Sequence, residues 1–380
     1  MKHKLFCCGL FWVTMLCYGI AEEGAKISPV RVLWSQNIVQ DLGLARFTDP
    51  TFLLNQRRAG IEFVNNEQLL IFEIDQDVTH FSSRDHSVLG SYSLQLSLVD
   101  PSSGKVITTR EIPSSSQKSE AMITTGGILV RARQSLHLCS FDLSGCRELP
   151  VKLKDGSPFL EIYRSPTQKS ILVKDFDEKL NRTTFALFDG TNMEPLRFWE
   201  EHGVQRRSSI SDDGMVWTND FGKIFFELFG STQWTTLTEN NRYCPTEHLS
   251  PTFIGNDYLA FGCEKLNTFQ VKQSELRAIP LPKDNYPSGK ICATQGGRLI
   301  AISLDKKNIK KHIFSEWSTQ FQGTHISIYD LISANRIFDV AVVPSPKKDY
   351  DFAISPDGLK LAILNDRQVT LYAVMTESEK

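Results

Sequence analysis

Basic and aromatic side chains crowd one stretch late in the chain, Asp305 to Gly323. It carries Lys306, Lys307, Lys310, Lys311, His312, Phe314, Trp317 and Phe321. A long connection of this composition can bind acidic or sugar-like groups through its charges and its ring faces. The alternative is a tolerated insertion whose lysines are merely solvated. An earlier long stretch, Asp75 to Gly90, adds His80, Arg84 and His86 as further candidate binding residues.

Signatures of familiar enzyme sites do not occur. The sequence has no H-E-x-x-H zinc motif, G-x-x-x-x-G-K-[ST] phosphate loop, G-x-S-x-G nucleophile elbow or C-x-x-C pair. Asp175, Asp177 and Asn181 have the spacing of part of a calcium loop but lack its glycine and terminal glutamate, so a solvated turn is favoured. The stretch Trp199 to His202 could hold an acid and a base on a loop, although loops of this composition are common. We therefore expect no metal and no cofactor, and no catalytic residue is assigned.

Five cysteines follow the N-terminal 21 residues, and in an exported protein they meet an oxidising compartment. Because five is odd, at least one stays free or pairs between chains. Cys139 and Cys146 bracket a hairpin turn centred between Asp142 and Leu143, so they face each other across the strands and could form a disulfide. Cys244 and Cys263 lie on connections that open on one face, which makes a second bridge possible. Cys292 lies in an apolar strand and is expected to be a buried free thiol. The alternative is that the five cysteines beyond residue 21 are all reduced and packed as small apolar residues.

The N-terminus has the pattern of a secretory signal. A basic start precedes an apolar run from Leu5 to Leu16, and small residues end at Ala21. We predict a signal peptide over residues 1–21; lipidation of Cys17 and a retained anchor are the alternatives. Two of the 42 basic residues lie in this segment, so the mature chain has 40 basic and 44 acidic residues, a net charge of −4. That charge gives no general attraction to nucleic acid or anionic lipid. We expect a secreted or periplasmic protein that has no membrane span after cleavage.

A repeated unit predicts the fold. Each copy is a short strand, a turn rich in Gly, Asp or Asn, and an apolar strand, with the turns marked by Gln68, Gly127, Lys169, Gly214, Asp257, Gly297 and Gly358. The steps between these turns are 59, 42, 45, 43, 40 and 61 residues. Four of the six match the length of a four-stranded propeller blade. The two longest contain Asp75–Gly90 and Asp305–Gly323, which are expected to be loops between the second and third strands of units one and six, on one face.

Further strands complete each unit. Asp100, Asp142, Asp189 and Asp330 each follow an apolar residue and open a hairpin, where an Asp accepts backbone N–H groups. The last unit has only three strands, and a lone strand, Val30 to Ser35, precedes the first unit. We expect that strand to complete the last blade and so close the ring. The sequence thus predicts an all-β fold, with residues 22–380 forming one seven-bladed β-propeller of four-stranded antiparallel blades.

The SPDG turn within Phe352–Leu364 and the Asp hairpins resemble those of the WD40-like and TolB-like propellers of exported bacterial proteins. The chain has no Gly-His pair, and Val, Phe or Tyr stands before the Asp of its hairpins. The resemblance implies a binding or assembly platform, often periplasmic. We therefore expect a non-enzymatic, monomeric binding module for a protein or cell-envelope ligand. The alternative is a propeller-type hydrolase or lyase with its site at the mouth of the central channel.

Overall fold

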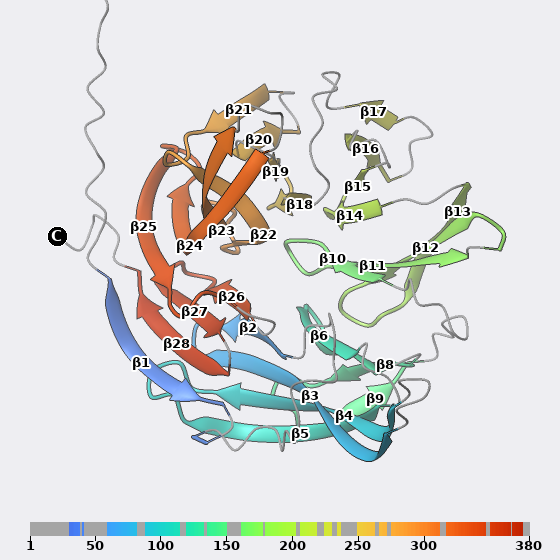
Figure 1. Cartoon of the computed structure of the whole chain (residues 1–380). Helices are drawn as coiled ribbons and strands as arrows, with labels where there is room; N and C mark the ends of the chain where they lie inside the picture. The colour runs from blue at the N-terminus through green and yellow to red at the C-terminus, as the bar shows by residue number, and fades with distance from the viewer. Residues whose placement is uncertain are drawn as a thin grey trace, which may run out of the picture.

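A computed structural model describes most of the chain between residues 30 and 374. The described residues are 30–38, 40–41, 59–81, 88–114, 119–132, 135–149, 161–177, 179–202, 206–218, 224–229, 234–236, 249–262, 266–271, 275–311, 317–346, 350–365 and 367–374. They form a ring of β-sheets (Figure 1). No helix in this part of the chain is long and apolar enough to cross a membrane. The predicted signal peptide, residues 1–21, lies outside the described residues.

Seven four-stranded blades make up the ring, with blades 5 and 6 also joined at one parallel pair, Leu249↔Gly289, and the prediction of a seven-bladed propeller is confirmed. Blade 1 contains β2 (Ala59–Asn65), β3 (Gln68–Phe81), β4 (Val88–Val99) and β5 (Val106–Ser114). Blade 2 contains β6 (Ser119–Thr124), β7 (Gly127–Ala132), β8 (Ser135–Cys139) and β9 (Cys146–Glu148). Blade 3 contains β10 (Glu161–Arg164), β11 (Ser170–Asp177), β12 (Arg182–Asp189) and β13 (Pro195–His202).

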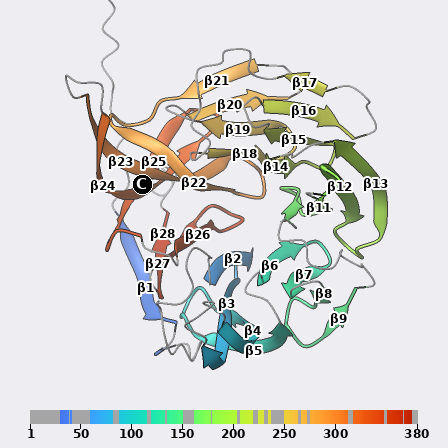
Figure 2. The same cartoon turned by 45° about the vertical axis from the view of Figure 1, so that its right-hand side comes forward.

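Blades 4 to 7 continue around the ring (Figure 2). Blade 4 contains β14 (Arg206–Ile210), β15 (Gly214–Thr218), β16 (Ile224–Leu228) and β17 (Trp234–Thr236), and blade 5 contains β18 (Leu249–Ile254), β19 (Tyr258–Gly262), β20 (Leu266–Gln270) and β21 (Glu275–Ile279). Blade 6 contains β22 (Asn285–Ala293), β23 (Leu299–Lys311), β24 (Trp317–Asp330) and β25 (Asn335–Val342). Blade 7 contains β26 (Tyr350–Ile354), β27 (Lys360–Asn365) and β28 (Gln368–Ala373), joined by β1 (Arg31–Asn37).

The N-terminal strand closes the ring as predicted. β1 pairs antiparallel with β28, from Arg31↔Ala373 to Asn37↔Gln368, and becomes the outermost strand of blade 7. The indole Nε1 of Trp34 donates a hydrogen bond of 2.8 Å to the carbonyl of Pro101 in blade 1. Because blade 7 combines both ends of the described chain, the ring has no open end.

Apolar side chains fill the spaces between blades. Seven core clusters occur among the described residues, and each joins two neighbouring blades. Phe185 on blade 3 packs with Ile210 and Met215 on blade 4, for example, and Phe338 on blade 6 packs with Phe352 on blade 7. A blade buries both faces in this way, which explains why central strands contain continuous buried runs, such as β7, which is buried along its whole length.

The predicted hairpin aspartates shape their turns. The carboxylate of Asp100 accepts the backbone N–H of Ser102 at 2.7 Å, and that of Asp189 accepts the N–H of Thr191 at 2.7 Å. Asp142 and Asp330 accept corresponding N–H groups at 3.0 and 2.8 Å. Each of the four lies where the third strand of a blade turns into the fourth. Their role as turn-forming residues is therefore confirmed.

Candidate functional site

The stretch of lysines near residue 310 extends a hairpin and is not the loop expected from the sequence. β23 and β24 pair continuously from Leu299↔Asp330 to Lys311↔Trp317. Within the described residues, β22 pairs with β23 as far as Lys306, and β25 pairs with β24 as far as Thr324. Beyond those pairs the hairpin is a two-stranded ribbon of residues 307–311 and 317–321, which we call the basic ribbon.

Blade 1 carries a similar extension in place of its expected loop. β3 and β4 pair out to Phe81↔Val88. The flanking strand β2 reaches Glu73 of β3, and β5 reaches Tyr92 of β4. We call residues 75–81 and 88–91 the acidic ribbon, because they contain Asp75 and Asp77 and no lysine or arginine.

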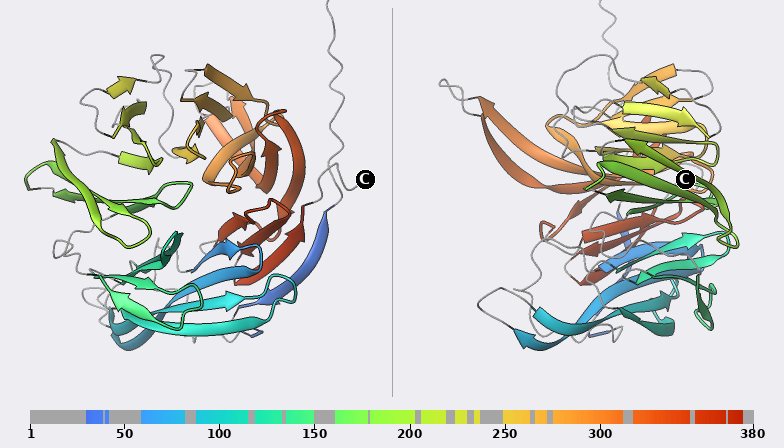
Figure 3. Two further views of the ribbon diagram at one scale, coloured as in Figure 1. Left: turned by 180° about the vertical axis from the view of Figure 1, so that it is seen from behind. Right: turned by 90° about the vertical axis from the view of Figure 1, so that its right-hand side faces the viewer.

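Both ribbons rise from the same face of the propeller, as predicted. Seen from the side, the two hairpins extend beyond the disc in the same direction (Figure 3, right). Blade 7 lies between blades 1 and 6, so the ribbons stand on either side of it.

The structure describes some of the candidate binding residues with their side chains, some by their backbone alone, and four not at all. Lys306 is exposed at the base of the basic ribbon. Lys307 is half-buried, 3.6 Å from a carboxylate oxygen of Asp305, and its backbone N–H donates to the carbonyl of Asp284 at 3.0 Å. The described backbone puts His80 in β3, Lys310 and Lys311 in β23, and Trp317 in β24. Arg84, His86, His312 and Phe314 lie outside the described residues.

Exposed apolar side chains mark the base of the basic ribbon. Phe321 on β24 is 46% exposed, and Val343, just after β25, is 82% exposed. The pair Thr324↔Val342 places the end of β25 beside the part of β24 that carries Phe321. Sequence reasoning missed Val343, because a single valine beside a proline carries no pattern.

A cavity of about 470 Å³ occupies the central channel. Its lining comes from the first strands of several blades, including Glu62 on β2, Arg164 on β10, Phe253 on β18 and Lys290 on β22. Sequence analysis did not identify these residues, because they converge only when the ring closes. This channel is where a propeller-type hydrolase or lyase would place its site.

The charged groups of the channel are engaged in structural contacts. Arg164 forms an ion pair with Glu62 and donates to the carbonyl of Ile123 at 2.9 Å, and Glu62 also accepts the N–H of Ile123 at 3.2 Å. Burial lowers the pKa of Arg164 to about 10, so its guanidinium stays charged at neutral pH. Lys290 lies 3.3 Å from a carboxylate oxygen of Asp351. These ion pairs link different blades.

Other residues considered from the sequence serve the fold. Trp199 to His202 lie in the outer strand β13, not on a loop, and Glu200 pairs with Arg182 of the neighbouring strand. Asp177 accepts the N–H groups of Lys179 and Leu180 at 3.0 and 3.1 Å, as expected for a turn. Among the side chains that the structure describes, no three acids, histidines or cysteines are arranged to hold a metal ion.

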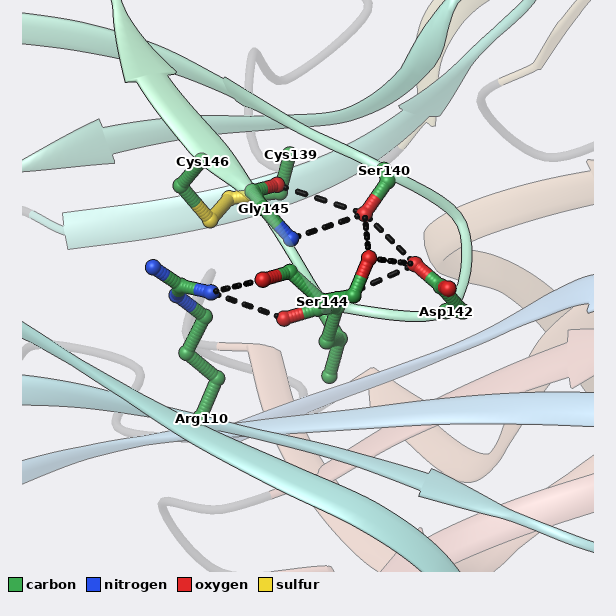
Figure 4. The surroundings of a disulfide bond; sticks show 8 residues. Arg110, Cys139, Ser140, Asp142, Ser144, Gly145 and Cys146 are labelled. Atoms are coloured by element: carbon green, nitrogen blue, oxygen red, sulfur yellow. Dashed lines mark hydrogen bonds between the residues drawn. A yellow bond between two sulfur atoms is a disulfide. The ribbon is translucent and has the colours of Figure 1, made fainter.

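One predicted disulfide is present. Cys139 and Cys146 are bonded across the β8–β9 hairpin, as their register indicated (Figure 4). Arg110 of blade 1 reaches this hairpin and donates to the carbonyls of Leu143 and Ser144 at 2.9 and 3.1 Å. Hydrogen bonds from Ser140 and Ser144 lower the pKa of Asp142 in the same turn to about 2.

Of the other three cysteines beyond residue 21, the structure describes Cys292 alone. Cys244 and Cys263, the candidates for a second bridge, lie outside the described residues. Cys292 is a free thiol as expected, but it is half-buried and not fully buried, because it faces the central cavity. Its Sγ lies 3.2 Å from the carbonyl oxygen of Phe352.

The cysteine scheme predicts a thiol count. A chain without residues 1–21, denatured without reductant, should show three free thiols if Cys139–Cys146 is the single bridge and one if Cys244 and Cys263 are also bonded. Five thiols would contradict the scheme. Replacing both Cys139 and Cys146 by Ser should lower the free energy of unfolding by about 2.5 kcal/mol, the loop-closure value for so short a loop. Cys292→Ser serves as the control and should leave the disulfide intact.

Comparison with known proteins establishes the fold and no closer relationship. No protein-family model matches the sequence. No curated protein matches it either. The WD40 domain of Neurospora crassa Pan2 is similar in structure, with a TM-score of 0.52 and 11% identity over 92% of this chain and 96% of that chain. The C-terminal WD40 domain of Sif2 has a TM-score of 0.48 and 10% identity over 93% of this chain and 100% of that chain. The chain therefore has the β-propeller fold seen in WD40 domains.

Proposed function

We propose that this protein is an exported, non-enzymatic binding propeller that holds a protein or cell-envelope partner on the face carrying the two ribbons. The observation behind the proposal is the basic ribbon itself, a paired hairpin that continues beyond the strands flanking it. A strand pair that extends from the rigid scaffold beyond its flanking strands suits contact with another molecule.

Three further features support the proposal. The Cys139–Cys146 disulfide suits an oxidising compartment, in agreement with the signal-like N-terminus. Glu62, which lines the channel, and the buried Asp351, which contacts the channel residue Lys290, each hold a cation and a backbone N–H group, which favours a structural use of the channel over catalysis. The sequence resemblance to exported TolB-like propellers implies the same kind of role.

Neutralising the lysines tests the proposal. Replacing Lys306, Lys307, Lys310 and Lys311 by Ser should change the free energy of unfolding by less than about 1 kcal/mol, because an ion pair near the surface, such as that of Lys307 with Asp305, contributes little to stability. Recovery of partners by the tagged protein from the cell-envelope fraction should fall severalfold. The measurement is quantitative mass spectrometry of the captured proteins.

A matched control comes from the opposite face. Lys105 and Lys169 are exposed and lie on turns at the other ends of the strands, so replacing both by Ser should leave capture unchanged. Equal recovery by the parent protein and the four-lysine variant would remove the proposal, and so would an equal loss of recovery with the control variant.

A further inference from the structure

We propose that the central cavity binds a small molecule with a carboxylate or phosphate group, and that Arg164 and Lys290 hold this anionic group. The cavity is separate from the ribbon face, so this inference goes beyond the proposed function and does not depend on it. It rests on the shape of the cavity, on its two ion pairs and on the polar side chains at its mouth.

The first argument is the size and position of the cavity. Its volume of about 470 Å³ is typical of a small-molecule site. Asn65, Asn66 and Gln295 line it, are exposed, and lie where the first strand of blade 1 or blade 6 turns into the second. The cavity therefore opens on the face opposite the ribbons. Carboxamide groups both donate and accept hydrogen bonds, so this mouth suits the polar part of a ligand.

The second argument is that the cation is the more exposed member of each ion pair. The Arg164 side chain is 30% exposed against 14% for Glu62. The Lys290 side chain is 38% exposed against 3% for Asp351. Both carboxylates also accept a backbone N–H group of the protein. Among the described residues that line the cavity, Glu62 is the only acid. A ligand therefore meets positive charge, although each pair is neutral as a whole.

The third argument is the chemistry of the two cations. Arg164 comes from blade 3 and Lys290 from blade 6, so positive charge reaches the cavity from two sides of the ring. A guanidinium group binds carboxylate and phosphate oxygens in a fixed planar geometry, and an ammonium group adds a second charge. A cavity with walls of low dielectric constant also concentrates the field of its charges. These properties favour an oxyanion over a neutral or cationic ligand.

Cys292 is a natural reporter of this positive charge. It is a free thiol that lines the cavity. Its Sγ and the Nζ of Lys290 both lie 3.2 Å from the carbonyl oxygen of Phe352, so the thiol is next to one of the two cations. Methanethiosulfonate reagents modify such a thiol: the thiolate attacks the reagent sulfur, displaces methanesulfinate and forms a mixed disulfide. The rates with charged reagents therefore measure the electrostatic potential inside the cavity.

Modification of Cys292, followed by mass spectrometry of its peptide, tests the inference. At low salt, the ratio of the rates with an anionic sulfonatoethyl reagent and a cationic trimethylammonioethyl reagent should be at least about tenfold higher in the folded protein than in the chain unfolded in urea. Citrate and inorganic phosphate are then added during reaction with a neutral methyl reagent, with sodium chloride at equal ionic strength as the control. At least one of the two anions should slow the reaction severalfold. Protection by citrate alone indicates a carboxylate ligand, and protection by phosphate alone indicates a phosphate ligand.

Variants test the role of the exposed cation. Lys290→Gln combined with Asp351→Asn removes the ion pair without changing the net charge, and it keeps an acceptor for the N–H of Ile61. The preference for the anionic reagent should fall severalfold. Lys290→Arg should keep this preference, and so should the four-lysine ribbon variant, even where that variant loses its envelope partners. A ratio no higher than in the unfolded chain would overturn the inference, as would no protection by either anion or an unchanged ratio in the folded double variant. If the double variant does not fold, the rate ratio and the protection of the parent protein decide.

Discussion

Deleting residues 22–36 is expected to lower the free energy of unfolding by about 5 kcal/mol, a large part of the stability of an ordinary domain. The deletion removes most of β1 and so exposes the outer edge of β28. Each lost ladder hydrogen bond contributes about 1 kcal/mol net. The link between Trp34 and the carbonyl of Pro101 in blade 1 is lost as well. Urea unfolding followed by tryptophan fluorescence and by circular dichroism measures the effect.

Point variants in β1 test whether the loss of stability comes from ring closure by this strand and not merely from shortening the chain. Trp34→Ala should cost about 2 kcal/mol, since the side chain is half-buried and bonds to blade 1. Val32→Ser, also in β1, should cost less than about 0.5 kcal/mol, because the Val32 side chain is 52% exposed. An unchanged, cooperative unfolding transition in the deletion variant would show that β1 does not close the ring.

Asp351→Ala is expected to cost about 3 kcal/mol, because it leaves buried polar groups without their partner. The Asp351 side chain is 3% exposed. One carboxylate oxygen accepts the N–H of Ile61 at 2.9 Å, and the other lies 3.3 Å from the Nζ of Lys290. A single side chain on blade 7 therefore connects blades 1 and 6. Chemical denaturation gives the difference in free energy.

Two comparison variants test whether the loss of stability comes from the contacts of the Asp351 carboxylate. Asp351→Asn keeps an acceptor for Ile61 and should cost about half as much as the alanine variant. Asp213→Ala removes an exposed carboxylate from the β14–β15 turn and should stay within about 0.5 kcal/mol of the parent. An alanine variant at 351 as stable as the Asp213 control would contradict a linking role for Asp351.

The repeat pattern predicted the propeller, because each blade repeats the same local events. An apolar strand, a tight turn and an Asp hairpin are each encoded within a few residues, as at Ser355–Gly358 and Asp330. Closure by β1 was also predictable, since the last unit has three strands and one unpaired strand precedes the first unit. The Cys139–Cys146 bond followed from hairpin register alone.

The candidate sites were harder to predict from the sequence. The second half of β23 was not recognised as a strand from the sequence, because strands rarely contain so many lysines. Apolar and polar residues also do not alternate regularly in this stretch. The ion pair of Arg164 with Glu62 joins side chains from blades 3 and 1. Only closure of the ring places them in one channel, and no local pattern encodes that proximity.

Site-specific photo-crosslinking tests most directly the claim that the ribbon face is the binding face. A benzophenone amino acid would replace one exposed phenylalanine at a time: Phe321 beside the basic ribbon, Phe141 on the β8–β9 turn of the opposite face, and Phe198 on the outer strand β13. Irradiation in the cell envelope, followed by mass spectrometry, reveals the molecule in contact at each position. We expect adducts at position 321 and none at positions 141 and 198. Adducts at 141 or 198 with none at 321 would contradict it.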